Sequence, residues 1–136
     1  MGTNIRPKIS ENNKYFISKH RYYELKHFVM QYNEWNRELE DLDGYYKESS
    51  SVIERIDKGQ TGNPTEHIAE RRKYLSDRVQ MVEECLDEEI GKQMLQAIIE
   101  DISYEKMNAK NILPCSKDAW YTAYRRFFWL LDKKRR

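Results

Sequence analysis

Apolar side chains recur every three or four residues along most of this chain, which is the spacing of one face of an α-helix. The longest such run begins at Ser18 and predicts a first helix that ends at Gly44. After it, Tyr45 to Ile56 predicts a short helix, and residues 58–62 contain two glycines that predict a loop. The apolar stripe of the first helix consists of Tyr22, Leu25, Phe28, Tyr32, Trp35, Leu39 and Leu42.

A second long helix is predicted from Pro64 to about Asp87. Asn63 is a favourable N-cap, and proline is well suited to the first position of a helix. A stripe with steps of three and four fits either a coiled-coil seam or the face between two packed helices. The lengths of the two stripes predict an antiparallel pair of long helices, which we interpret as a scaffold or dimerisation element.

The pattern changes after Gly91, where shorter helices are predicted. Apolar residues concentrate between 94 and 102, and Ser103 can cap a short helix from Tyr104 to about Lys110. We expect Asn111 to close this helix in the left-handed conformation, and Pro114 prevents the helix from continuing.

Ser116 can cap a last helix that extends to about Leu131. We expect Phe128 and Trp129 of this helix to be partly exposed. Its predicted core face consists of Trp120, Ala123, Phe127 and Leu130 or Leu131. Its opposite face consists of Lys117, Asp118, Tyr121, Thr122, Arg125 and Arg126.

The predicted fold is therefore all-α, with a long antiparallel helix pair followed by a C-terminal helix-turn-helix. Three prolines and five glycines leave little material for a turn-rich β fold. We expect a flexible lead-in over residues 1–17, the scaffold or dimerisation region over 18–90, and the helix-turn-helix over 91–136.

The net charge of +1 hides a local asymmetry. Between Ser76 and Asp101 there are eight acidic residues and two basic ones, whereas from Lys117 to Arg136 there are seven basic residues and two acidic ones. A basic segment of this kind is typical of a surface that faces phosphates. It is equally typical of a solubilising helix end whose cations complement the helix dipole.

A helix-turn-helix reads DNA with the N-terminal half of its second helix in the major groove. Small polar and basic side chains there can bond base edges, and a basic tail can hold the backbone. The candidate base-reading residues are Ser116, Lys117, Tyr121, Thr122 and Arg125. The candidate phosphate contacts are Arg126, Lys133, Lys134, Arg135 and Arg136.

The segment from Ile102 to Leu131 resembles the helix-turn-helix of phage and prophage regulators of the RinA/ArpU type, a module similar in plan to region 4 of sigma factors. The resemblance is carried by an apolar-Ser-Tyr-Glu start at 102–105, a turn ending in Ser116, and an aromatic residue followed by Arg125 and Arg126. It implies binding to double-stranded DNA and transcriptional activation of late phage genes. The long helices would then supply a homodimer interface or a contact to RNA polymerase.

Two departures from this pattern leave alternatives open. Trp120 occupies a position where the family has a small β-branched residue, and the first helix of the motif is short. A DNA-packaging protein similar to a small terminase subunit, or a helical protein-interaction module without DNA binding, also fits the sequence.

Catalytic and metal-binding signals are weak. His20, His27 and His67 lack the Cys or carboxylate partners of a zinc site, and no phosphate-binding loop or nucleophile elbow is present. Cys85 and Cys115 show no motif spacing and are expected to be reduced and structural. We therefore expect no enzyme activity and no cofactor. No apolar run is long enough for a membrane span and no signal peptide is evident, so a cytoplasmic protein is expected.

Overall fold

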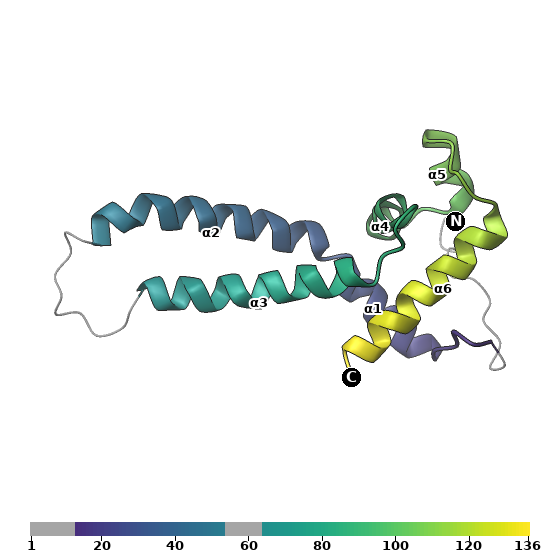
Figure 1. Ribbon diagram of the computed structural model, residues 1–136, viewed down its shortest axis with the longest axis horizontal. Coiled ribbons are helices and arrows are strands. Elements are labelled where there is room, and N and C mark those ends of the chain that lie inside the picture. Colours follow the sequence, from purple (N-terminus) through teal and green to yellow (C-terminus); the bar gives the residue numbers. More distant parts are fainter. Residues whose placement is uncertain (1–12, 54–63) are drawn as a thin grey trace. The chain divides into compact units, whose positions relative to one another are not determined.

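The computed structural model describes residues 13–53 and 64–136, and within these ranges the chain forms α-helices and no β-strand (Figure 1). The all-α prediction is confirmed. The predicted loop at 58–62, the Asn63 cap and most of the 1–17 lead-in lie outside the described residues. The helices are α1 (Lys19–Val29), α2 (Tyr32–Ile53), α3 (Pro64–Glu84), α4 (Gly91–Glu100), α5 (Tyr104–Lys110) and α6 (Lys117–Lys134).

The described residues form two compact units. The first contains residues 13–32 and 81–136, and the second contains residues 33–53 and 64–80. These units differ from the expected regions 18–90 and 91–136, because α1 and the end of α3 belong with the C-terminal helices.

The first predicted helix is divided into α1 and α2 by a turn at Met30 and Gln31. The last carbonyls of α1 are satisfied locally. The backbone N–H of Met30 donates to the Lys26 carbonyl, and the Gln31 side chain donates to the His27 carbonyl. Because these groups find partners within the turn, the helix can end without a glycine or a proline.

The expected helix end at Gly44 is wrong, because α2 continues through it to Ile53. Gly44 is exposed, and apart from its own helix no atom of the described residues lies within 4 Å of the position that a Cβ would occupy. Nothing in its surroundings therefore demands glycine. A helix-interior glycine costs free energy but does not by itself stop a helix.

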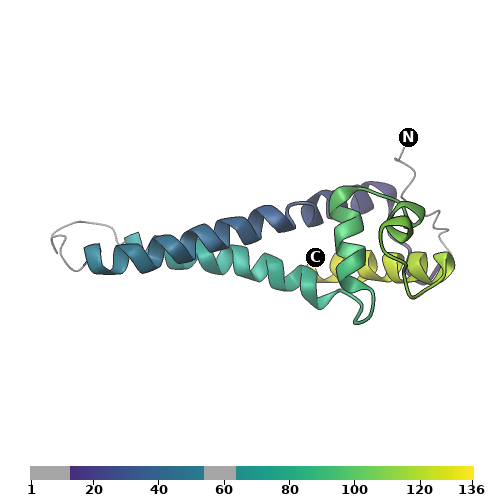
Figure 2. The same cartoon turned by 90° about the horizontal axis from the view of Figure 1, so that it is seen from above.

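In the second unit, α2 and α3 lie side by side and antiparallel (Figures 1 and 2). Helix α3 begins at Pro64, as predicted from its preference for the first helical position. Ion pairs join the described parts of the two helices. Arg71 Nε lies 2.6 Å from a Glu38 oxygen, and Arg72 Nε lies 2.7 Å from an Asp43 oxygen.

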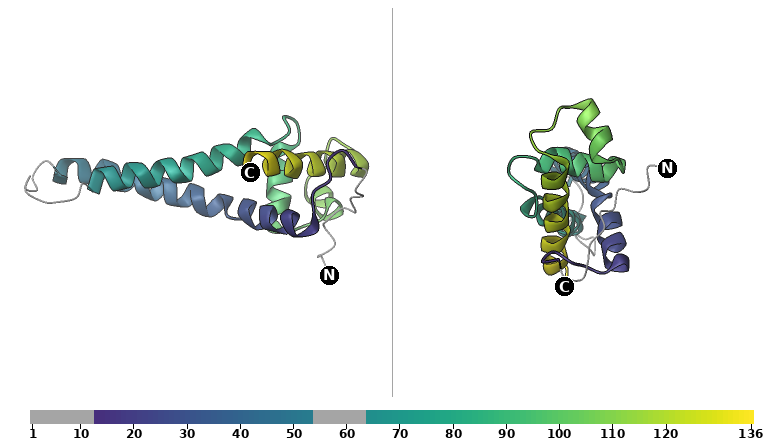
Figure 3. Two further views of the ribbon diagram at one scale, coloured as in Figure 1. Left: turned by 90° about the horizontal axis from the view of Figure 1, so that it is seen from below. Right: turned by 90° about the vertical axis from the view of Figure 1, so that its right-hand side faces the viewer.

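In the first unit, α1 packs against α6 and α4, and α4 runs crosswise to α6 (Figures 2 and 3). The core is rich in aromatic side chains. Phe128 is only 1% exposed, so the expectation of its partial exposure is wrong. The cause is α1, whose Tyr22 ring packs edge-on at 5.0 Å between ring centroids. The aromatic residues that are almost completely buried are Tyr22, Trp120, Tyr124, Phe127 and Phe128.

A pair of buried hydroxyl groups joins α1 to α6. The Tyr22 and Tyr124 hydroxyl oxygens are 2.7 Å apart, so one donates a hydrogen bond to the other. Burial raises the pKa of Tyr124 well above its usual value, and the neighbouring Tyr22 adds to this effect. Tyr124 therefore stays neutral, and the hydrogen bond satisfies hydroxyl groups that the core would otherwise leave unbonded.

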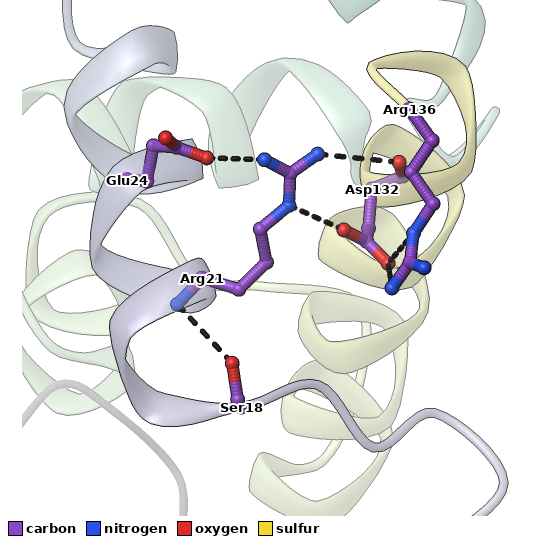
Figure 4. A network of polar contacts seen from close by, with 5 residues as sticks. All are labelled: Ser18, Arg21, Glu24, Asp132 and Arg136. Atoms are coloured by element: carbon purple, nitrogen blue, oxygen red, sulfur yellow. Dashed lines mark hydrogen bonds and ion pairs between the residues drawn. The ribbon is translucent and has the colours of Figure 1, made fainter.

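Asp132, near the end of α6, is the centre of a polar network with α1 (Figure 4). Its side chain is buried, and Arg21 Nε donates to one carboxylate oxygen at 2.5 Å. Arg136 Nε donates to the other oxygen at 3.0 Å, and Arg21 also pairs with Glu24. Burial alone would raise the pKa of Asp132. The hydrogen bonds from Arg21 and Arg136 outweigh burial and hold the pKa below its usual value.

A second ion pair joins α1 to the end of α4. Lys26 Nζ lies 2.6 Å from an Asp101 carboxylate oxygen. Asp101 ends α4 in the left-handed conformation, with φ of 57°, and so directs the chain into α5. Helix α1 is therefore attached both to α6 and to the turn that precedes α5.

We expect Gly44→Ala to stabilise the protein by about 0.5–1 kcal/mol, because alanine loses less backbone entropy in a helix and the site has room for its methyl group. Urea unfolding followed by far-UV circular dichroism measures this change.

Gly91→Ala is the matched control and should destabilise. A Cβ at Gly91 would lie 2.8 Å from the Leu86 Cβ, so the start of α4 would have to shift. Equal effects of the two substitutions would contradict this account of the glycines.

Asp132→Asn should lower the free energy of unfolding by about 1–3 kcal/mol at neutral pH, because Arg21 loses a charged acceptor. A carboxyl group with a depressed folded-state pKa stabilises the protein above its unfolded pKa of about 3.9 and loses that contribution as pH falls through the folded value. The wild type should therefore lose stability in acid more steeply than Asp132→Asn. Urea unfolding at neutral and acidic pH compares them.

The control for this prediction is Asp77→Asn, which removes an exposed pair with Lys73 and should change stability little. An Asp132→Asn variant with wild-type stability at neutral pH would show that the network contributes nothing.

Candidate nucleic-acid interface

Helix α5 starts where the sequence predicts. The Ser103 side-chain oxygen accepts the backbone N–H of Lys106 at 3.2 Å, which makes it an N-cap. The expected left-handed conformation of Asn111 is wrong, because its φ of −142° and ψ of 120° are extended. The turn closes by other means, since the Asn108 side chain accepts the backbone N–H of Leu113 at 2.8 Å.

Helix α6 also starts at its predicted cap, where the Ser116 side-chain oxygen accepts the backbone N–H of Ala119 at 3.2 Å. Residues 111–116 form the turn between α5 and α6. Tyr104 of α5 fixes this turn, because its hydroxyl donates to the Cys115 carbonyl at 2.8 Å. Its ring also packs edge-on against Trp120. The bulky Trp120 thus fills the junction between the two helices.

Exposed residues with spacings of three, four and seven lie along one side of α6. We call Ala119, Thr122, Arg126 and Lys133 the outer stripe. All four are exposed, while the opposite side of α6 is buried in the aromatic core. The stripe begins with small side chains near the N-terminus and becomes basic further along.

Three predicted base-reading residues have contacts within the chain. Ser116 is the N-cap of α6. Lys117 Nζ lies 3.2 Å from a Glu105 oxygen, which joins α6 to α5. The Tyr121 hydroxyl accepts the backbone N–H of Tyr104 at 3.3 Å. The structure thus brings these residues together at the α5–α6 junction, where they also hold the two helices in place.

The other two predicted base-reading residues contact each other. The Thr122 hydroxyl donates to the Asp118 carbonyl at 2.9 Å and accepts a weak hydrogen bond from an Arg125 terminal nitrogen at 3.4 Å. Arg125 Nε is buried and has no acceptor among the residues that the structure describes. The Arg125 side chain therefore lies along α6 rather than extending from it.

Two predicted phosphate contacts are engaged in ion pairs. Lys134 Nζ lies 3.0 Å from a Glu84 oxygen at the end of α3, and Arg136 pairs with Asp132 at 2.9 Å. Acidic residues therefore partly neutralise the C-terminal end of α6, which sequence charge counts do not reveal.

The remaining predicted phosphate contacts differ in their surroundings. Lys133 Nζ lies over the Trp129 ring at 3.6 Å, and the Arg135 guanidinium lies over the Phe28 ring at 3.8 Å. Arg126 is exposed and makes no hydrogen bond or ion pair within residues 13–53 and 64–136. Arg126 and Lys133 are thus the cations of the outer stripe that carry no acidic partner in that part of the chain.

Sequence reasoning did not select Ala119, although it is exposed on the same side of α6 as Thr122. Its spacing of three residues from Thr122 was the available signal. Sequence reasoning also did not select Arg21 and Lys26. Their acidic partners are distant in sequence, and no local pattern identifies them.

The described residues offer little for other kinds of chemistry. Both cysteines are free thiols, and burial raises the pKa of Cys85 to about 11. Within residues 13–53 and 64–136, no three His, Cys, Asp or Glu side chains gather where they could hold a metal ion. None of the described helices combines the length and the apolar character needed to cross a membrane.

Comparison with known proteins identified no similar protein. No protein-family model matches the chain, and searches of curated proteins and of solved structures gave no significant match.

Proposed function

We propose that α5 and α6 form a helix-turn-helix that binds double-stranded DNA, with the N-terminal half of α6 in the major groove. The observation that carries this proposal is the outer stripe. Its first members, Ala119 and Thr122, are small enough for close approach of the helix to base edges, and Arg126 and Lys133 follow on the same side.

The outer stripe is longer than the major groove is wide, so its members cannot all contact bases. Ala119 and Lys133 are about 21 Å apart along the helix at 1.5 Å per residue, whereas the major groove is about 12 Å wide. In this proposal the N-terminal members reach base edges. Arg126, about 10.5 Å along the helix from Ala119, meets the phosphate backbone near the groove edge, and Lys133 meets it beyond the groove. Phosphate contacts of this kind position a protein, and base contacts specify the sequence.

The resemblance to RinA/ArpU-type regulators supports a role in transcription of late phage genes. In this proposal, the α2–α3 pair serves dimerisation or contact with RNA polymerase. The packaging alternative uses the same DNA-binding helix, and the mass of the protein in solution separates the two, because a packaging ring contains many subunits. Burial of Phe128 removes part of the aromatic surface on which the protein-interaction alternative was based.

Arg126→Gln should weaken binding to random-sequence duplex DNA about eightfold at about 0.1 M salt, because each neutralised phosphate adds about 0.9 to the slope of log K against log salt. The slope should decrease in magnitude by about one unit. Fluorescence anisotropy of a labelled duplex over a range of salt concentrations measures both quantities.

The matched control is Arg37→Gln, which removes the same charge from an exposed position in the second unit. It should leave the affinity and the slope close to those of the wild type. Equal losses in both variants would indicate non-specific attraction by net charge. An absence of binding at low salt would refute the proposal.

A further inference from the structure

The groups that α6 presents at its N-terminal half decide what it can read in a groove. The polar groups of Ser116, Lys117 and Tyr121 are used in the cap and in contacts to α5. The exposed side chains of the outer stripe in this half are Ala119 and Thr122.

Thr122 presents a methyl group rather than a free hydroxyl. Its hydroxyl proton is donated back to the Asp118 carbonyl, and Arg125 approaches the hydroxyl oxygen. A threonine side chain is stiff at χ1, so a hydroxyl held against the preceding turn fixes the direction of the methyl group as well. Because Thr122 is exposed, that methyl group is available to a partner.

From these observations, and resting on the proposed function, we propose that α6 reads thymine through its 5-methyl group, with the Ala119 and Thr122 methyl groups as the specificity-determining contacts. Alanine and threonine methyl groups are suited to this contact, and thymine is the base that displays a methyl group in the major groove. The occupant of this surface is duplex DNA, since the methyl groups are followed on the stripe by Arg126 and Lys133, which complement phosphate charge.

The test uses two random-sequence duplex libraries, one containing thymine and the other containing uracil in its place. The full-length protein selects from a library made with thymidine and from the same library made with deoxyuridine, which lacks the 5-methyl group and pairs identically. We expect a thymine-containing motif from the first library and its loss from the second. For a duplex selected from the first library, replacing one contacted thymine by uracil should weaken binding about fourfold, the value of one buried methyl group.

Two substitutions of the exposed Thr122 separate a methyl contact from a hydroxyl contact. Thr122→Ser keeps the hydroxyl bond to Asp118 but removes the methyl group, so at the base that Thr122 contacts its affinities for thymine and uracil should become equal, while a thymine contacted by Ala119 should still be preferred. Thr122→Val keeps methyl groups and removes the hydroxyl, so it should still prefer thymine. Far-UV circular dichroism checks that both variants fold.

The results distinguish this inference from the function on which it rests. Binding to both libraries with the same motif, or with no motif, overturns the thymine contact and leaves DNA binding in place. A guanine motif that 7-deazaguanine abolishes would assign base reading to a rearranged Arg125 instead. No binding to either library overturns both proposals.

Discussion

The packing of α1 against α6 is the interaction on which the first unit depends. It buries Tyr22 against Phe128 and brings the Tyr22 and Tyr124 hydroxyls into contact. It also places Arg21 next to Asp132, a buried carboxylate that would be costly without a cationic donor. Since α1 contacts α4 and α6 together, one N-terminal helix holds the two elements that frame α5.

Because one side of α6 is fixed in this core, its outward side is fixed too. A helix with Tyr124, Phe127 and Phe128 buried must direct Ala119 and Thr122 to the surface, since these positions lie across the helix from the core residues. The cap and the α5 contacts then use the polar groups nearest the N-terminus. Rigid placement of the stripe is what a DNA-reading helix requires, because base contacts depend on side chains held in one position.

Sequence reasoning succeeded where the determining interaction is local. Ser103, Ser116 and Pro64 act within one helical turn, and each helix starts where these residues predict. It failed at Gly44, because the residues on either side stabilise the helix enough for it to continue through a glycine. The role of α1 and the burial of Phe128 were missed for a different reason. Their contacts join residues about a hundred positions apart, and an amphipathic stripe does not identify its partner.

The basic segment shows why charge in a sequence and charge at an interface differ. Lys134 and Arg136 hold Glu84 and Asp132, so their charges are partly compensated before any ligand arrives. Exposed ion pairs of the Lys134 type contribute little to stability, and a phosphate could replace the carboxylate at small cost. This exchange contributes less binding free energy than a phosphate contact made by Arg126, because at Lys134 the phosphate only replaces a carboxylate that is already bound. In the proposed complex with DNA, the electrostatic part of the affinity should therefore follow Arg126 and Lys133 rather than the total number of basic residues in the last helix.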